Sequence, residues 1–253
     1  MVVPYWPSKY PVMVTAHRGF SGAAPENTLL AFRKALEIGA DMLELDVRLS
    51  RDRQIVVIHD ETVDRTTNAK GKVFDYSLKD LRRLDAGASF SPQYTRETIP
   101  TLREVLDLVQ GKVPINIEIK NPNESGYSIV DLTDRTLEEV RKAGMLSQVI
   151  YSSFNPQALE RIKEKEPRVW VALLYHQNWN SLRDVTGGRE YQVLNMRQLY
   201  LSQSKITQIH KAGMKVNVYT VNSEEELERF VHWGVDGIIT NHPEKLIKIL
   251  KKP

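Results

Sequence analysis

The chain has 253 residues, of which 41% are hydrophobic, a size and composition that suit a single α/β barrel with a large buried core. Its formal net charge is only +3, and acidic and basic residues are interspersed, so the charge gives no argument for a nucleic-acid partner. The sequence contains no cysteine, which excludes disulfides, thiolate metal sites and a cysteine nucleophile.

The N-terminal segment and the overall hydropathy predict where the protein resides. Prolines interrupt residues 1–14, where a signal peptide needs an unbroken apolar stretch. No segment reaches the roughly 20 apolar residues that are needed to span a bilayer. We therefore expect a cytoplasmic protein with no stable membrane insertion.

Strand-like apolar segments alternate with amphipathic helical stretches along the whole chain. The eight predicted strands are residues 12–16, 42–49, 115–120, 149–152, 169–174, 192–195, 215–220 and 237–240. Four predicted helices end at a glycine that a strand follows within a few residues, namely Gly39, Gly144, Gly213 and Gly234. Eight strands with helices between them predict a parallel α/β protein, and that number favours a closed (β/α)8 TIM barrel.

The segment between the second and third predicted strands is much longer than one helix requires. Residues 54–58 form a further predicted strand, and a polar run rich in turn residues follows it. We interpret this region, residues 54–101, as a small insertion over one end of the barrel. The whole chain, residues 1–253, is then one barrel domain, and residues 175–191 are its other irregular stretch.

Charged residues occupy one face of the second strand and one face of the third. Glu44, Asp46 and Arg48 alternate with apolar residues, while Glu118 and Lys120 alternate with isoleucines. Either strand alone would more often be the solvated face of an antiparallel sheet. Two such strands within a βα pattern reverse that preference, because the apolar face of a barrel strand packs under the helices. The charged faces should therefore meet inside the barrel near its C-terminal rim.

Three carboxylates on these two faces predict a metal site. Clustered like charges are costly unless something compensates them, and a divalent cation held by Glu44, Asp46 and Glu118 would do so. Ligands that are all oxygen suit Mg²⁺ or Ca²⁺ better than zinc.

Two histidines follow apolar strands at the same rim. His17 precedes Arg18 after the first strand, and His59 precedes Asp60 after the additional strand. A lone histidine is usually structural, but at an active rim histidine is the side chain best suited to proton transfer near neutral pH. Arg18 offers a planar fork for phosphate oxygens. A cation, Arg18, Lys120 and two histidines together suit phosphoryl transfer.

The remaining histidines are weaker candidates for a functional role. His210 and His232 fall within predicted helices, where exposure or packing explains them. His242 follows the last strand and is within reach of the rim. His176 lies in the irregular stretch and has no predicted place.

Ten short motifs run in a fixed order across nearly the whole chain. They are His17-Arg18-Gly19, Pro25-Glu26-Asn27-Thr28, Glu44-Leu45-Asp46-Val47, His59-Asp60, Asp64-Arg65-Thr66-Thr67, Ile99-Pro100-Thr101-Leu102, Glu118-Ile119-Lys120, Ser153-Phe154, Val218-Tyr219-Thr220-Val221-Asn222 and Asp236-Gly237-Ile238-Ile239-Thr240. As a set they resemble the glycerophosphodiester phosphodiesterase family. The resemblance implies a (β/α)8 barrel with a small inserted subdomain, here roughly residues 60–101. It also implies hydrolysis of a small-molecule glycerophosphodiester to sn-glycerol 3-phosphate and an alcohol.

The resemblance also implies a role for each site residue. Glu44, Asp46 and Glu118 would bind one divalent cation, and His17 and His59 would be the acid–base pair. Arg18 and Lys120 would bind the phosphate, and Phe154 and Tyr219 would make further substrate contacts. The attacking group would be the 2-hydroxyl of the substrate's own glycerol, through a cyclic phosphate. The residues alone leave direct attack by water equally open, and they do not say which histidine is the base. Tyr219 and Asn241 stand where the family often has tryptophan and aspartate.

Two other functions remain as alternatives. A lysophospholipase D would need an apolar groove beside the rim, to which Phe20, Phe90, Phe154 and Tyr219 are candidates, although core packing explains isolated aromatics equally well. A non-catalytic barrel that binds phosphorylated ligands is the other, because a fold does not dictate a function. The complete set of ionisable residues argues against it.

Overall fold

The computed structural model describes residues 8–123 and 126–251, and its centre is a closed barrel of parallel strands. Within this part of the chain the barrel strands are β1 (Met13–Ala16), β2 (Met42–Leu49), β4 (Ile115–Ile119), β5 (Val149–Ser153), β6 (Trp170–Tyr175), β7 (Val193–Arg197), β8 (Lys215–Tyr219) and β9 (Gly237–Thr240). The ring is closed because β1 pairs with both β2 and β9. The predicted (β/α)8 fold is confirmed.

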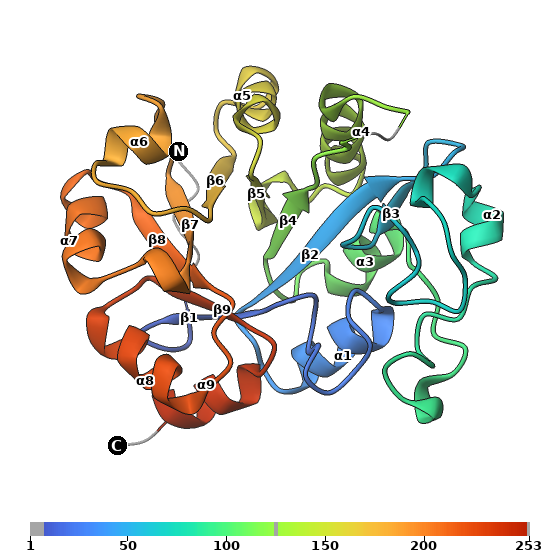
Figure 1. Cartoon of the computed structure of the whole chain (residues 1–253), viewed down its shortest axis with the longest axis horizontal. Helices are drawn as coiled ribbons and strands as arrows, with labels where there is room; N and C mark the ends of the chain where they lie inside the picture. The colour runs from blue at the N-terminus through green and yellow to red at the C-terminus, as the bar shows by residue number, and fades with distance from the viewer. Residues whose placement is uncertain (1–7, 124–125, 252–253) are drawn as a thin grey trace.

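Helices surround the strands as an outer layer (Figure 1). The α-helices are α1 (Leu29–Glu37), α2 (Leu78–Leu81), α3 (Leu102–Val109), α4 (Ile129–Lys142), α5 (Pro156–Lys165), α6 (Leu182–Thr186), α7 (Gln203–Lys211), α8 (Glu224–Trp233) and α9 (Pro243–Leu250). Short 3₁₀ turns are η1 (Val73–Asp75), η2 (Pro92–Tyr94), η3 (Leu146–Gln148) and η4 (Gln198–Tyr200). Among the described residues, no helix combines the length and apolar character that a membrane crossing requires.

Helix α3 illustrates how the outer layer forms. Thr101 caps its N-terminus, with Thr101 Oγ1 accepting from the Glu104 amide while the Glu104 carboxylate accepts from the Thr101 amide. Its buried residues recur at helical spacing and pack on the barrel, namely Leu102, Val105, Leu106 and Val109. Truncating one such leucine to alanine typically costs about 2–5 kcal/mol of stability.

The two faces of each barrel strand serve different layers. The outward residues of β2, such as Leu43 and Leu45, join the large core beneath the helices. The inward residues at the N-terminal end of the barrel form a separate apolar cluster of Met13, Met42, Ile150, Ala172 and Val193. This cluster fills the bottom of the barrel, so the polar inward residues above it can open only toward the C-terminal rim.

The segment between β2 and α3 packs around a small core of its own. Its strand β3 (Ile55–Val57) runs antiparallel to the end of β2. The apolar residues of this small core are Val56, Ile58, Val63, Val73, Leu81, Ala86 and Ile99. The segment lies beside the barrel in Figure 1, at the right of the view with β3 and α2.

Candidate active site

Three buried carboxylates meet on the inner faces of β2 and β4. Glu44 and Asp46 point inward from β2, and Glu118 points inward from β4, directly opposite Asp46 in the parallel register. One oxygen from each carboxylate lies within 4.8 Å of the others, a grouping that could hold a metal ion. The alternation along two neighbouring strands produces this convergence, as the sequence pattern predicts.

Two cations accompany the carboxylates, and together these five residues form what we call the mouth cluster. Lys120 Nζ lies 2.6 Å from Glu118 Oε1 and 3.4 Å from Asp46 Oδ1. Arg18 Nε lies 3.3 Å from Asp46 Oδ2, and the Arg18 amide donates to Glu44 Oε2 at 2.9 Å. The mouth cluster therefore carries three formal negative charges against two positive ones.

The electrostatics differ among the three carboxylates. Burial and the negative charges of Asp46 and Glu118 raise the pKa of Glu44 well above its usual value. Burial also raises the pKa of Glu118, although Lys120 partly offsets it. Burial alone would raise the pKa of Asp46, but Lys120 and Arg18 outweigh that effect and hold it well below its usual range. A further positive charge at Glu44 and Glu118 would relieve this repulsion.

The turn after β1 brings Arg18 over the carboxylates. Arg18 adopts a left-handed backbone with φ 54°, and Gly19 follows with φ 78°. A Cβ on Gly19 would lie only 2.6 Å from the Ala31 backbone, so only glycine fits there. Asn27 is also left-handed, and its Nδ2 donates to Asp46 Oδ2 at 2.9 Å. Such backbone conformations persist only where the surroundings fix them.

His17 is the first of the two predicted proton carriers. It follows β1, and its Nδ1 donates to Asn241 Oδ1 at 2.6 Å, which leaves Nε2 as the free acceptor. That Nε2 lies 3.9 Å from Glu44 Oε2. Burial and the Arg18 guanidinium lower the pKa of His17 from its usual 6.5 to about 4, so the imidazole is neutral near pH 7.

His59 lies after β3, and its environment differs from that of His17. Its Nδ1 donates to Asp60 Oδ1 at 2.6 Å, so its partner is a carboxylate rather than an amide. This hydrogen bond and those from Arg65 hold the pKa of Asp60 well below its usual range. The two histidines are therefore not equivalent, because the ring of one is held by an amide and the ring of the other by a carboxylate.

A cavity of about 140 Å³ opens above the mouth cluster. Eight of the nine predicted site residues line it, and Asp46 lies just outside that lining. Its apolar wall consists of Phe154, Leu174, Tyr219 and Ile239. Phe154 packs edge-on against Tyr219, with ring centroids 6.3 Å apart.

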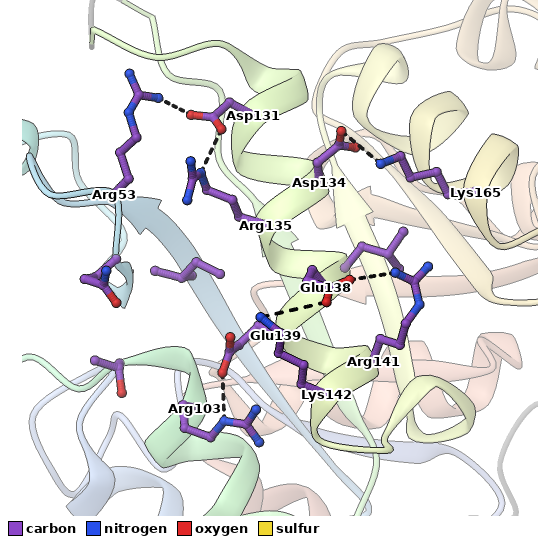
Figure 2. Close-up of a pocket in the computed structure, with 14 residues that line it drawn as sticks. Arg53, Arg103, Asp131, Asp134, Arg135, Glu138, Glu139, Arg141, Lys142 and Lys165 are labelled. Carbon is purple, nitrogen blue, oxygen red and sulfur yellow. Dashed lines mark hydrogen bonds and ion pairs between the residues drawn. The ribbon is translucent and has the colours of Figure 1, made fainter.

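A larger hollow of about 780 Å³ lies elsewhere, along helices α3, α4 and α5, and contains none of the predicted site residues. We call it the outer groove. Its walls carry ion pairs between neighbouring elements, including Arg53–Asp131, Arg103–Glu139 and Lys165–Asp134 (Figure 2).

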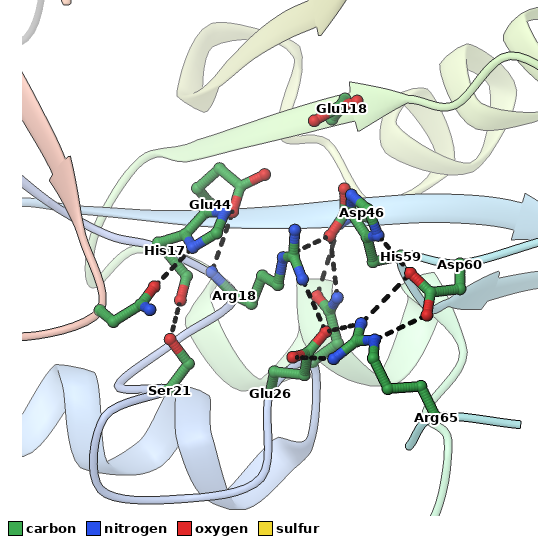
Figure 3. A network of polar contacts seen from close by, with 12 residues as sticks. His17, Arg18, Ser21, Glu26, Glu44, Asp46, His59, Asp60, Arg65 and Glu118 are labelled. Atoms are coloured by element: carbon green, nitrogen blue, oxygen red, sulfur yellow. Dashed lines mark hydrogen bonds and ion pairs between the residues drawn. The ribbon is translucent and has the colours of Figure 1, made fainter. Parts of the chain in front are cut away.

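Several residues around the site have no role that the sequence pattern predicts. Figure 3 shows Glu26 between Arg18 and Arg65, and Asp60 between His59 and Arg65. Asp60 directly follows His59, and that adjacency is a signal by which it could have been found. The others come together only in three dimensions.

The weaker histidine candidates do not line the mouth cavity. His210 Nε2 pairs with Asp236 at the end of α7, and His232 lies in α8. His242 is the residue before α9, with its Nδ1 3.3 Å from Glu244 Oε1. His176 lies 5.0 Å from the Phe154 ring, beside the apolar wall.

Aromatic residues proposed for a lipid groove are similarly dispersed. Phe20 is buried in the main core, and Phe90 is exposed and packs against Tyr94. Only Phe154 and Tyr219, of the four candidates, line the mouth cavity.

Comparisons with known proteins agree on one family. The model of the glycerophosphoryl diester phosphodiesterase family matches residues 17–245. A glycerophosphodiester phosphodiesterase of Caldanaerobacter subterraneus is 39% identical over 242 residues, which is 95% of this chain and 98% of that protein. One from Bacillus subtilis is 33% identical over 265 residues, covering 95% and 87%. The structure of an Oleispira antarctica phosphodiesterase in complex with the product sn-glycerol-3-phosphate superposes with a TM-score of 0.87 at 27% identity, covering 98% of both chains.

Proposed function

The chain belongs to the glycerophosphoryl diester phosphodiesterase family and is a glycerophosphodiester phosphodiesterase, and we propose that the mouth cavity hydrolyses its substrate with a divalent cation and two histidines. The observation that carries this proposal is the meeting of three buried carboxylates, two cations and two histidines around one cavity. The products would be sn-glycerol 3-phosphate and an alcohol. A product complex of the same kind is described for the Oleispira antarctica relative.

The ligands of the cation would be Glu44, Asp46 and Glu118. Their fit is supported by Asp46 Oδ1, which is buried and accepts no hydrogen bond from the part of the chain that the structure describes. It is supported also by the pKa of Glu44, which burial and the negative charges of Asp46 and Glu118 raise well above its usual value. An all-oxygen donor set favours Mg²⁺ or Ca²⁺. When bound, such a cation supplies positive charge against the phosphate oxygens.

Arg18 and Lys120 would hold the phosphate. Both line the mouth cavity, and nearby carboxylates already hold both in position. A bound phosphate would therefore meet two cations that are fixed in place. The guanidinium of Arg18 can bond two phosphate oxygens at once, whereas Lys120 provides a point charge. The apolar wall of Phe154 and Tyr219 would contact the carbon skeleton of the substrate.

The two histidines would divide the proton transfers. Phosphodiester cleavage removes a proton from the attacking oxygen and gives one to the leaving alkoxide, on opposite sides of phosphorus. The neutral His17, with Nε2 free, suits the first task, and His59 beside Asp60 suits the second. We propose that the attacking group is the substrate's 2-hydroxyl, which gains from proximity and yields a cyclic phosphate that water then opens.

The test is release of sn-glycerol 3-phosphate from glycerophosphocholine. We expect release that EDTA abolishes and that added Mg²⁺ or Ca²⁺ restores. Release that is unaffected by EDTA in metal-free buffer would contradict the cation. A glycerophosphocholine analogue without the 2-hydroxyl should not be cleaved. If it is cleaved as fast as the parent compound, direct attack by water is the better account.

A further inference from the structure

Arg65 links two parts of the candidate active site that are far apart in sequence. Its guanidinium donates two hydrogen bonds to each of two carboxylates (Figure 3). Nη1 and Nη2 donate to the two carboxylate oxygens of Glu26 at 2.7 and 2.8 Å. Nε and Nη2 donate to the two carboxylate oxygens of Asp60 at 2.7 and 3.2 Å. One side chain thus joins the loop after β1 to the residue after His59.

Both carboxylates also bind a residue that lines the mouth cavity. Glu26 Oε1 accepts from Arg18 Nη1 at 2.7 Å, and Asp60 Oδ1 accepts from His59 Nδ1 at 2.6 Å. We propose that Arg65 is a positioning residue that fixes the orientation of Arg18 and of His59 relative to each other. This inference rests on the roles proposed above for Arg18 and His59, because Arg65 acts only through them.

The small core of the inserted segment holds the backbone around Arg65 in place. Thr67 closes the turn around Arg65, since its amide and its hydroxyl both donate to the Val63 carbonyl. Val63 is buried in the small core that also contains Val56 of β3. The insertion therefore contributes to the candidate active site through a side chain that follows this hydrogen-bonded turn.

The chemistry of this link requires arginine. A planar guanidinium can bond two carboxylates through parallel N–H groups, whereas a lysine ammonium offers a point charge without fork geometry. Burial would raise the pKa of Glu26, but the hydrogen bond from Arg65 and the charge of Arg18 outweigh it and hold that pKa below its usual value. Arg65 thereby keeps Glu26 an acceptor for Arg18.

The experiment compares Arg65→Met and Arg65→Lys with a matched control. Arg161 makes a similar fork to Asp134 at 2.8 and 2.9 Å, on the outside of the barrel between α4 and α5. We expect Arg65→Met to lower kcat/KM for glycerophosphocholine by about 10- to 100-fold, the range for a misplaced binding and acid–base pair. Arg65→Lys should remain closer to Arg65→Met than to the parent. Arg161→Met should stay within about twofold of the parent.

A spectroscopic readout separates positioning from general destabilisation. The proton on His59 Nδ1, hydrogen bonded to Asp60, should give a downfield imidazole resonance that disappears in His59→Ala. Arg65→Met should shift or broaden this resonance, while Arg161→Met should not. An unchanged resonance in Arg65→Met would overturn the proposal, and so would activity within about twofold of the parent. A loss of activity equal to that of Arg161→Met would overturn it too.

Failure of the proposed function would have a different signature. If the parent enzyme is active but Arg18→Lys and His59→Ala are unimpaired, the roles assigned to Arg18 and His59 are wrong. If those two variants are impaired and Arg65→Met is not, only the inference about Arg65 fails. The resonance of His59 does not depend on the substrate, so it tests the link in either case.

Discussion

The mouth cluster and the outer groove both contain many charged side chains. They differ in how deeply those side chains are buried and in the balance of negative and positive charge. In the outer groove Asp131 pairs with Arg53 and Arg135, and Glu138 pairs with Arg141 and Lys142, at a surface where these side chains are partly exposed (Figure 2). In the mouth cluster the carboxylates are buried on two adjacent strands, and negative charge is in excess.

The difference shows that neither charge density nor cavity size identifies an active site. Exposed ion pairs contribute about 0–1 kcal/mol each, so the groove is consistent with an ordinary solvated surface. Buried like charges are costly, and a chain retains them where a ligand or a reaction uses them. The larger hollow contains none of the predicted site residues, so substitutions matched between the two regions should have unequal effects.

The largest expected difference concerns the carboxylates. Glu118→Ala should abolish metal-dependent release of glycerol 3-phosphate, by about 10³-fold or more, because it removes a ligand of the cation. Glu138→Ala in the outer groove should leave activity within about twofold of the parent. Steady-state assays in Mg²⁺ and Ca²⁺, with circular dichroism to verify folding, measure both. Near-normal activity and metal affinity in Glu118→Ala would remove Glu118 from the site.

The histidines should give the next largest effect. His17→Ala and His59→Ala should each lower kcat by about 10²-fold or more, which is the range for lost general acid–base catalysis. His210→Ala removes an exposed imidazole that pairs with Asp236, and it should leave kcat unchanged.

Combining the two substitutions sharpens this prediction. The double variant His17→Ala/His59→Ala should lose far less than the product of the single losses, because the two residues act as a unit. Fully multiplicative losses would instead indicate that the two histidines serve independent steps.

The smallest effect is a pH-dependent stability at the edge of the mouth cavity. The pKa of Glu26 is held below its usual value despite burial, chiefly by Arg65 and Arg18. The unfolded chain therefore binds a proton at higher pH than the folded chain does. The stabilisation is present above about pH 4.3, the unfolded value, and is lost as the pH falls through the lower folded value.

Urea unfolding between pH 3 and 7 tests this sign. Glu26→Gln should lower the free energy of unfolding by about 1–2 kcal/mol above about pH 5, and its difference from the parent should shrink below about pH 4. Glu138→Gln, in the exposed groove, should change it by less than about 0.5 kcal/mol. A Glu26→Gln deficit that grows on acidification would have the wrong sign for this account.

The barrel can be predicted from the sequence because the alternation of apolar and polar residues marks its strands. Alternation predicts a strand over residues 42–49, and β2 has those bounds. Strand ends are harder to predict, since the pattern indicates residues 192–195 where β7 runs from Val193 to Arg197. There the apolar pattern gives way to residues whose pairing with β8 decides the end.

The candidate site divides in the same way. The inward carboxylates follow from alternation along single strands, so the sequence pattern alone suffices to place Glu44 and Glu118. Asn241 lies 224 positions from the His17 side chain that it binds, and Arg65 lies 39 positions from Glu26. Local sequence patterns do not encode which loops meet, and these orienting residues emerge only from the closed ring and its insertion.

The apolar cluster at the bottom of the barrel has a consequence for substrate entry and product release. Met13, Met42 and Ile150 help to fill the N-terminal end of the barrel, so within the described residues the candidate active site opens toward the C-terminal rim. We expect substrate to enter, and both products to leave, at that rim. The phosphate of a glycerophosphodiester joins its two halves, and with the roles proposed above it would bind at Arg18 and Lys120, inside this rim. Because glycerol 3-phosphate retains that phosphate, we expect accumulated glycerol 3-phosphate to compete with incoming substrate.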